Sequence, residues 1–221
     1  DVFYVRVDRT RKLPVTTLLR AIGVISDDQI RELFGDEEMI TATIAKDTIK
    51  DQDEALIEIY KKLRPGELPT ADAARNLFNG LFFDNRRYDL AKVGRYKFNQ
   101  KLNLSARIKD KVAAQDIVDN ETGEVFVQAG EVISEEIAQN IQDSGINIVD
   151  IMLGERKVRI IGNSTCNIHK VLPNVDLSSL HFKELVNYNV LKNIMDTTKD
   201  EKDLLKILKE RYDELVPKHI T

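Results

Sequence analysis

Apolar residues in the first half of the chain recur at helical spacing between clear turn signals. The clearest case is segment 51–64, whose apolar positions i, i+3, i+4 and i+7 predict one buried helical face: Leu56, Ile59, Tyr60 and Leu63. The sequence RPGELPT at 64–70 cannot continue this helix, because its two prolines and its glycine favour a turn. Thr70 is then the expected N-cap of a further helix.

The segment before this helix predicts one strand and three short helices. β-Branched and aromatic residues favour a strand over 2–7. A helix should run from Pro14 to just before Gly23, because proline suits the first helical turn and glycine the position after the last. Ser26 is the expected N-cap of the next helix, and a third is expected around 37–45.

Near residue 112 the pattern changes from helix to strand. Two short strands should flank a turn at 119–123, and Ser134 should cap a helix that ends at about Asp143. Two more strands are expected before residue 162, and an amphipathic helix over 199–216. The predicted fold class is α+β, mainly helical, with a small β-rich subdomain inserted. The expected divisions are 1–112, 113–162 and 163–221.

Composition excludes several classes of protein. Hydrophobic residues make up 42% and charged residues 32%, which is typical of a folded chain rather than a disordered one. No apolar run approaches the ~20 residues of a membrane span, so no membrane partner is expected. The single Cys166 cannot form an internal disulfide, which favours a reducing, cytoplasmic setting. The start without Met and the apparent N-cap at Thr221 suggest a truncated piece of a larger protein.

The net charge of −4 conceals an asymmetry between the two halves. Residues 1–112 carry 21 Lys and Arg against 18 Asp and Glu, a balance of +3, whereas residues 113–221 carry 12 against 19, a balance of −7. Nine basic and two acidic residues lie within 86–111. The segregation suggests that the first half meets a polyanion. A solvated helix face explains the same charges, and charge alone does not decide between the two.

Two basic clusters are candidate nucleic-acid contacts. The first comprises Arg9, Arg11 and Lys12, in the expected turn between the first strand and the Pro14 helix, a good position for phosphate contacts. The second cluster contains five residues: Arg86, Arg87, Lys92, Arg95 and Lys97. Tyr88, Tyr96 and Phe98 are interleaved with it. These aromatic rings could stack on bases or could face the protein core.

A catalytic or metal-binding constellation is not evident in the sequence. It contains no Walker-type phosphate loop and no G-x-S-x-G elbow. Cys166 and His169 are spaced like a pair of zinc ligands, and His181 is a candidate third ligand. A structural zinc site usually has four ligands with a closer second pair. A buried thiol with exposed histidines is therefore the favoured interpretation.

Three blocks of the chain resemble the β subunit of bacterial DNA-directed RNA polymerase. These blocks are VRVDRTRKLPVTTLLRAIG (5–23), DEALIEIYKKLRPGELPTADAARNLF (53–78) and LFFDNRRYDLAKVGRYKFNQKL (81–102). The matching region is the lobe of the subunit, also called β2, one wall of the cleft that holds downstream DNA. Segment 119–151 is similar to a β–β′ module, which occurs as a lineage-specific insertion. The last 50 residues or so resemble lobe sequence from Gram-positive bacteria.

The chain departs from the family pattern at two positions. Thr10 stands where the family usually has another basic residue, which weakens the first cluster by one charge. Leu68 replaces the more usual proline of RPGEPPT, a change in a loop that should matter little. The absence of a large insertion between the helix ending at Phe34 and the one starting near Asp53 favours the Gram-positive type.

The resemblance implies a part of a nucleotidyltransferase that is not catalytic alone. The polymerase extends RNA on a DNA template with magnesium, which the β′ subunit binds. Expected partners are therefore DNA, the β′ and α subunits and the remainder of β, with sigma or other transcription factors as further candidates. Arg9, Arg11 and Lys12 match the family's basic loop. The second cluster is the weaker candidate, since its residues could brace the lobe against neighbouring parts.

Two alternatives stay open at this stage. The acidic half, 113–221, could dock a transcription factor, or it could be a passive lineage-specific insert. A free-standing enzyme would require a catalytic group that the sequence does not show.

Overall fold

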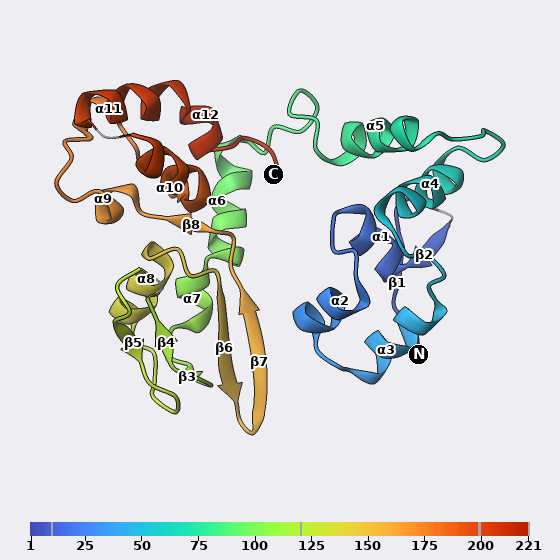
Figure 1. Ribbon diagram of the computed structural model, residues 1–221, viewed down its shortest axis with the longest axis horizontal. Helices are drawn as coiled ribbons and strands as arrows, with labels where there is room; N and C mark the ends of the chain where they lie inside the picture. Colours follow the sequence, from blue (N-terminus) through green and yellow to red (C-terminus); the bar gives the residue numbers. More distant parts are fainter. Residues whose placement is uncertain (10, 120, 199, 221) are drawn as a thin grey trace. The chain divides into compact units, whose positions relative to one another are not determined.

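The computed structural model describes residues 1–9, 11–119, 121–198 and 200–220. The expectations placed on Thr10 and Thr221 lie outside these residues. The chain forms two compact units, Asp1–Tyr88 and Asp89–Thr221, which appear in blue to cyan-green and in green to red (Figure 1). Each unit is described by itself below. The expected division into 1–112, 113–162 and 163–221 remains a prediction.

The first unit consists of a β-hairpin followed by helices. In chain order its elements are β1 (Tyr4–Arg6), β2 (Lys12–Pro14), α1 (Val15–Ala21), α2 (Asp27–Phe34), α3 (Glu38–Lys46), α4 (Gln52–Leu63) and α5 (Ala71–Phe82). The strand and the five helices confirm the sequence predictions. The interpretation of Lys12 as a turn residue was wrong, because Lys12 lies in β2 and pairs with Arg6 of β1. Burial of Leu13 against the helices makes this segment a strand.

The helix boundaries follow from their caps. Ser26 and Gln29 form a capping box, in which Gln29 N donates to Ser26 Oγ at 3.1 Å and Ser26 N donates to Gln29 Oε1 at 3.0 Å. Thr70 Oγ1 accepts from Ala73 N at 3.2 Å. Gly35 ends α2 with φ at +82°, a conformation that favours glycine. Leu68 is exposed in the loop between α4 and α5.

The core of the first unit joins the hairpin to α1, α4 and α5. Its buried residues are Leu13, Ala21, Ala55, Leu56, Ile59, Tyr60, Ala74 and Phe78. Three of the four residues in the expected α4 stripe are therefore buried, and Leu63 packs against them at the edge. A smaller cluster of Ile30, Ile40 and Ile44 joins α2 to α3.

The second unit combines helices with three small antiparallel sheets. Its elements are α6 (Ala91–Leu102), α7 (Leu104–Ile108), β3 (Val112–Ala113), β4 (Ile117–Val118), β5 (Val125–Val127), α8 (Glu135–Asp143), β6 (Ile148–Leu153), β7 (Arg156–Ile161), β8 (Thr165–Cys166), α9 (Ile168–Val171), η1 (Ser178–Leu180), β9 (Val186–Asn187), α10 (Tyr188–Thr197), α11 (Glu201–Glu210) and α12 (Tyr212–Leu215). The sheets are β3-β6-β7, β4-β5 and β8-β9. Helices and small antiparallel sheets together confirm the α+β class.

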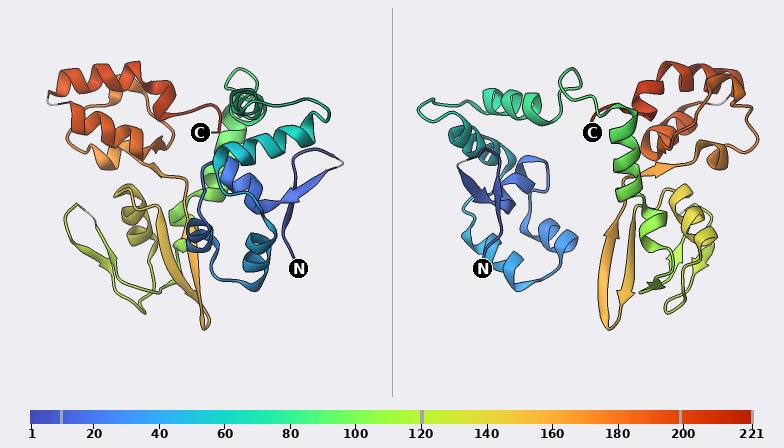
Figure 2. Two further views of the ribbon diagram at one scale, coloured as in Figure 1. Left: turned by 45° about the vertical axis from the view of Figure 1, so that its right-hand side comes forward. Right: turned by 180° about the vertical axis from the view of Figure 1, so that it is seen from behind.

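The β-rich part has its own core, and α7 contributes to it. Leu104 and Ile108 of α7 are buried among residues of β3, β5, α8 and β6. Ser134 caps α8 as expected, since its Oγ accepts from Ile137 N at 3.2 Å. In the views of Figure 2, α7 (green) lies beside the long β6–β7 hairpin, and Arg107 Nη1 donates to Ile161 O. The core of this part therefore begins before residue 113.

The expectation of one helix over 199–216 was wrong. The segment forms α11 and α12, separated at Arg211. Arg211 has φ −98° and ψ 21°, and its guanidinium binds Glu214 Oε2 at 2.7 Å and Asn193 Oδ1 at 3.0 Å. Leu208 of α11 and Leu215 of α12 are buried in the same core as Leu191 of α10.

Candidate nucleic-acid interface

The basic residues of the first cluster lie on the β1–β2 hairpin, which projects from the helices of the first unit (Figure 2, left). Arg9 and Arg11 lie in the segment between the strands and are exposed, as is Lys12 at the start of β2. Arg9 N donates to Asp8 Oδ1, and Arg6 Nη1 donates to Arg9 O at 3.4 Å. The backbone of the segment is thus held locally while the Arg9 and Arg11 side chains reach solvent.

Within the part of the chain that the structure describes, the cations of the hairpin form no ion pair with a carboxylate. Among the described residues, no carboxylate oxygen lies within 4.0 Å of a charged nitrogen of Arg6, Arg9, Arg11 or Lys12. Antiparallel register moreover places Arg6 directly opposite Lys12. Like charges in directly opposed positions destabilise a strand pair. An anion bound at this hairpin would relieve that repulsion.

Sequence reasoning missed two further cations beside the hairpin. Arg6 could have been found from strand alternation, which places it on the face of Tyr4 and opposite Lys12. Lys46, at the end of α3, gave no signal because it is far from the hairpin in sequence. Its Nζ lies 5.5 Å from the centroid of the Tyr4 ring, and Lys12 Nζ lies 4.3 Å from the same centroid.

The structure distributes the second cluster over different environments. Arg86 and Arg87 follow α5 in the first unit and are exposed. Arg87 Nε lies 3.4 Å from Asp84 Oδ2, and Arg87 Nη1 donates to Gly80 O at 3.4 Å. Asp84 Oδ1 also accepts from Arg86 N at 3.0 Å. Arg87 is therefore partly neutralised, whereas the charged group of Arg86 stays in solvent.

Helix α6 of the second unit carries the other three members. Lys92 and Lys97 are exposed and form no ion pair with a described carboxylate. Arg95 is held inside the unit: its Nη1 lies 3.2 Å from Glu184 Oε2 and donates to Val216 O at 3.1 Å. The Arg95 side chain is only 14% exposed. Arg95 is therefore the member least available to a phosphate and acts as a brace between segments.

The aromatic residues of the second cluster do not face a core in the described structure. Tyr88, Tyr96 and Phe98 are 42%, 66% and 41% exposed. Helix α6 buries none of its residues. The core-facing alternative is thus not what the structure shows, and these rings are accessible to a base or to another protein surface.

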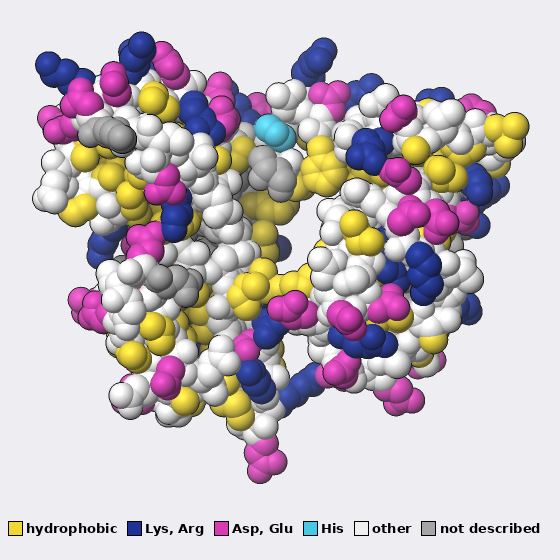
Figure 3. Space-filling model, viewed as in Figure 1, with side chains coloured by type: hydrophobic (Ala, Val, Ile, Leu, Met, Phe, Trp, Pro, Cys, Tyr) yellow, Lys and Arg dark blue, Asp and Glu magenta, His cyan; other side chains and the backbone are white. Residues whose placement is uncertain are grey.

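Positive and negative side chains are mixed on the one face of the molecule that Figure 3 draws. We therefore identify the candidate interface from the cations that form no ion pair with a described carboxylate. The charge of the surface as a whole does not identify it.

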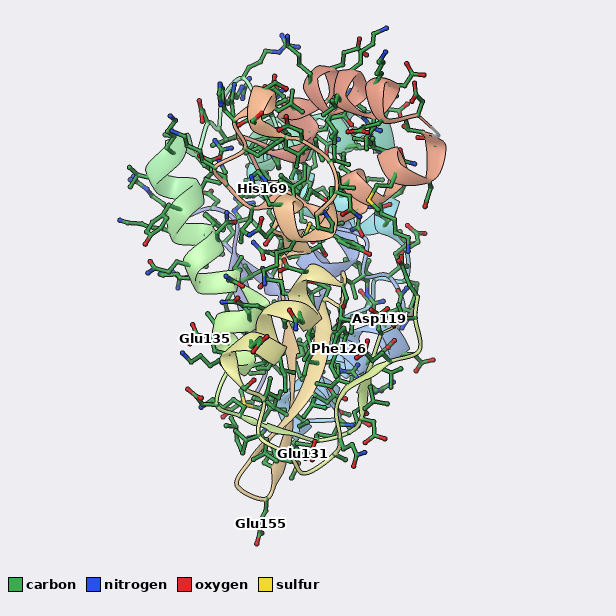
Figure 4. The ribbon with its side chains drawn as sticks, turned by 90° about the vertical axis from the view of Figure 1, so that its left-hand side faces the viewer. Asp119, Phe126, Glu131, Glu135, Glu155 and His169 are labelled. Carbon is green, nitrogen blue, oxygen red and sulfur yellow. The ribbon has the colours of Figure 1, made fainter. Side chains whose placement is uncertain are left out.

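Several acidic residues of the second unit form hydrogen bonds or ion pairs with neighbouring residues of the same unit. Asp119, Glu131, Glu135 and Glu155 lie at the periphery of the β-rich part (Figure 4). Asp119 Oδ1 accepts from Glu121 N at 2.7 Å and holds the β4–β5 turn, and Glu131 Oε2 accepts from Gln128 N at 3.0 Å. Glu135 Oε2 lies 2.6 Å from Lys109 Nζ. Turn hydrogen bonds and an ion pair thus account for Asp119, Glu131 and Glu135 within the unit.

Cys166 and the two nearby histidines do not converge. Cys166 is buried in the core of α10–α12, and burial raises the pKa of its thiol to about 12. His169 Nε2 lies 3.2 Å from Phe182 O, and His181 is exposed with φ at +50°. Within the described ranges, no group of three or more His, Cys, Asp or Glu is placed to hold a metal ion. The described helices also include none with the length and apolar character of a membrane span.

Comparison with known proteins places the chain in a family. The family model described as RNA polymerase Rpb2, domain 2 matches residues 1–119. DNA-directed RNA polymerase subunit beta of Clostridioides difficile (strain 630) is 53% identical over 221 residues, which is 100% of this chain and 18% of the relative. The subunits of the same name from Clostridium novyi (strain NT) and Clostridium acetobutylicum are 51% and 53% identical over 220 residues, with the same coverage.

The matched relatives are much longer than this chain, which spans less than a fifth of their length. The match nevertheless runs through every segment described above, including the β-rich part that the family model covers only to residue 119. The resemblance noted in the three sequence blocks is confirmed. The chain therefore belongs to the RNA polymerase Rpb2, domain 2 family, and the relatives that it matches over its whole length are bacterial β subunits.

Proposed function

We propose that the chain serves transcription as a non-catalytic part of a DNA-directed RNA polymerase, in which the β1–β2 hairpin contacts the DNA backbone in the cleft. The relatives named as β subunits support the first part of the proposal. One observation carries the second: Arg9, Arg11 and Lys12 are exposed on a projecting hairpin and have no carboxylate partner among the described residues.

Contacts of this kind are independent of sequence and sensitive to salt. Arginine can bind a phosphate through two parallel hydrogen bonds, and lysine supplies a point charge. Each phosphate neutralised on duplex DNA contributes about −0.9 to the slope of log affinity against log salt concentration. A few contacts from one hairpin give weak binding, which must be measured at low salt. The hairpin would then guide DNA without selecting its sequence.

If the chain is part of such an enzyme, its partners, its location and the source of the catalytic chemistry follow. The β′ and α subunits and the rest of β would be neighbours in the assembly, and other parts would supply magnesium and the nucleotidyl-transfer chemistry in the cytoplasm. Lys92, Lys97 and Arg86 are further candidate DNA contacts, because their charged groups reach solvent. Arg87 and Arg95 are the weaker candidates, because each binds a carboxylate.

The proposal is tested by DNA binding across a salt series. Fluorescence anisotropy of a short labelled duplex should show weak binding by the 221-residue chain that falls steeply with salt. The variant Arg9→Ala/Arg11→Ala/Lys12→Ala should lower the magnitude of the log–log slope by about 2.7, at about 0.9 for each contact. An unchanged slope in the folded triple variant would refute the hairpin contact.

A matched control removes the same charge elsewhere in the first unit. The variant Lys61→Ala/Lys62→Ala/Arg64→Ala loses three cations near the end of α4, where each pairs with Glu58 or Glu67. Its slope should stay close to that of the wild type. An equal loss in both variants would show a general effect of net charge rather than a site.

The alternative role for 113–221 is a docking surface for a transcription factor. Local ion pairs and turn hydrogen bonds already account for Asp119, Glu131 and Glu135, so no observation specifically favours docking over a structural role. Deleting 113–162 would leave Leu104 and Ile108 without the core that buries them. The double variant Glu131→Gln/Glu155→Gln removes two negative charges without deleting that core. Its affinity for duplex DNA should equal that of the wild type.

A further inference from the structure

Two lysines from different elements converge on one tyrosine ring in the first unit. Lys12 Nζ of β2 lies 4.3 Å from the centroid of the Tyr4 ring, and Lys46 Nζ at the end of α3 lies 5.5 Å from it. The ammonium group of Lys46 beside the phenol holds the pKa of Tyr4 below its ordinary value. Arg6, on the same face of β1 as Tyr4, lies opposite Lys12. We call these four residues the Tyr4 cluster.

A buried threonine fixes the distance between α3 and the hairpin. Phe3 N donates to Thr43 Oγ1 at 3.0 Å, and Thr43 Oγ1 donates to Met39 O at 2.6 Å. Lys46 follows Thr43 by three residues and therefore lies on the same side of the helix. Since Phe3 directly precedes Tyr4, this bond brings Lys46 beside the phenol. A hydrogen bond between two segments of the fold therefore brings Lys46 close to Tyr4, despite the repulsion between Lys46 and Lys12.

The cluster gathers three cations without an anion. Among the described residues, no carboxylate forms an ion pair with Arg6, Lys12 or Lys46. Asp47, the nearest acidic residue to Lys46 in sequence, is turned inward, where its Oδ2 accepts from Arg20 Nε at 3.3 Å. Asp8 accepts a hydrogen bond from Arg9 N through Oδ1 and forms no ion pair with a described cation of the cluster. The carboxylates of the neighbouring elements thus leave the three positive charges uncompensated.

Structural effects account for only part of this arrangement. A lysine in the last turn of a helix is stabilised by the helix dipole, which explains one cation at the end of α3. Each cation–π contact at an exposed ring contributes only about 0.5–1 kcal/mol. Neither effect favours a second ammonium at the same ring, because like charges repel. A bound anion between the cations removes the repulsion, and phosphate oxygens accept hydrogen bonds from both lysines and from arginine.

We propose that the Tyr4 cluster is a phosphate-binding site for the DNA backbone, in which Lys46, Lys12 and Arg6 bind phosphate and the Tyr4 ring holds the two ammonium groups in place. The inference rests on the proposed function and extends it from the hairpin to α3. Tyr4 is a positioning residue, since it acts through the lysines. The DNA path then runs along the face shared by β1, β2 and the end of α3.

The test measures how binding to duplex DNA depends on salt for three single variants. Two of them change Lys46, and the third changes Lys61 as a control. Lys46→Gln should lower the magnitude of the log–log slope by about 0.9. Lys46→Arg should retain the wild-type slope, because it keeps the charge. Lys61→Gln removes an exposed lysine that pairs with Glu58 and should also retain it. A Lys46→Gln slope equal to that of Lys61→Gln would overturn the proposal.

A fourth variant tests the tyrosine without removing a charge. Tyr4→Leu deletes the ring while Arg6, Lys12 and Lys46 remain, and the partial exposure of Tyr4 makes the change tolerable to the fold. It should weaken binding at low salt, whereas Tyr4→Phe, which keeps the ring, should weaken it less. Equal affinity of Tyr4→Leu and the wild type would refute the positioning role.

Failure of this inference can be told apart from failure of the proposed function. If the Arg9/Arg11/Lys12 variant flattens the slope but Lys46→Gln does not, only the Tyr4 cluster is refuted as a site. If the folded wild-type chain shows no salt-dependent binding at low salt, both proposals are overturned.

Discussion

Gly145 lies so close to the ring of Tyr188 that no side chain fits between them. Gly145 follows α8 with φ at +84°, and a Cβ at this position would lie well inside the van der Waals contact distance of three carbon atoms of the Tyr188 ring. Tyr188 begins α10, and its backbone N donates to Ser164 O at 2.8 Å. The contact joins the β-rich part to the C-terminal helices within the second unit.

Gly145→Ala should destabilise the second unit by about 3 kcal/mol. About 1–2 kcal/mol comes from the left-handed backbone conformation, and the rest from displacing the ring. Gly154→Ala is the matched control, because Gly154 has φ at +62° but nothing within 4 Å of the added Cβ. Denaturant unfolding followed by circular dichroism measures both. Equal losses in the two variants would show that contact with Tyr188 contributes nothing.

Arg20→Ala should strongly destabilise the first unit. Arg20 is 1% exposed, and its guanidinium binds Asp47, Asp27 and the carbonyl of Ile25. Removing it leaves the Asp47 charge buried and unpaired, at a cost of about 3–5 kcal/mol. Arg31→Ala, which breaks only exposed ion pairs with Asp28 and Asp36, should cost less than about 1 kcal/mol. Thermal unfolding of the two variants gives the comparison.

The first unit should become less stable at acid pH, and protonation of Asp27 should contribute to this loss. The hydrogen bond from Arg20 holds the pKa of Asp27 below its ordinary value of 3.8. Because the folded-state pKa is lowered, the stabilisation is fully present above pH 3.8 and is lost as the pH falls through the folded-state value. Asp27→Asn should flatten this part of the stability curve. Denaturant unfolding of the wild type and the variant across the acid pH range measures the difference.

The Cys166 thiol should react only when the second unit opens. Burial raises its pKa to about 12, so the folded unit presents almost no thiolate at pH 8. Because Cys166 is the single cysteine of the chain, a thiol reagent reports on this unit alone. Modification should be slow in buffer and fast in denaturant. Rapid labelling under native conditions would show that the core around Cys166 opens readily.

Variants of Arg95 and Lys97 should show that Arg95 stabilises the second unit, whereas Lys97 is available for DNA contact. Arg95→Ala removes the ion pair to Glu184 and the bond to Val216 O, and should cost about 2–3 kcal/mol. Lys97→Ala should change stability by less than about 0.5 kcal/mol, and it lowers the salt slope if α6 touches DNA. Cys166 labelling in denaturant reports the stability of both variants. A large stability loss in Lys97→Ala would contradict this division of roles.

Local signals explain why much of the helical half could be predicted. Ser26, Thr70 and Ser134 act as N-caps because each hydroxyl needs only a backbone N–H two or three residues ahead. The Leu56–Ile59–Tyr60 stripe of α4 is buried because helical spacing alone gathers these residues on one side. The family resemblance likewise depends on the residues of three continuous blocks.

Long-range contacts decided the rest. Leu13, beside Lys12 in β2, packs against helices that come later in the chain. The expected last helix is divided at Arg211, whose guanidinium binds Asn193 of α10. Arg95 and Lys97 look equivalent in sequence, and only the neighbourhood of Glu184 makes one of them a brace.

At the candidate site, too, some features follow from local sequence and others from long-range contacts. The sequence by itself determined the family, the helix caps and the basic cluster of Arg9, Arg11 and Lys12, because these depend on residues close together in the chain. Only the tertiary structure placed Lys46 beside Tyr4, since that approach depends on the hydrogen bond between Phe3 and Thr43, 40 residues apart. Periodicity and charge along a single chain carry no information about which distant segments meet.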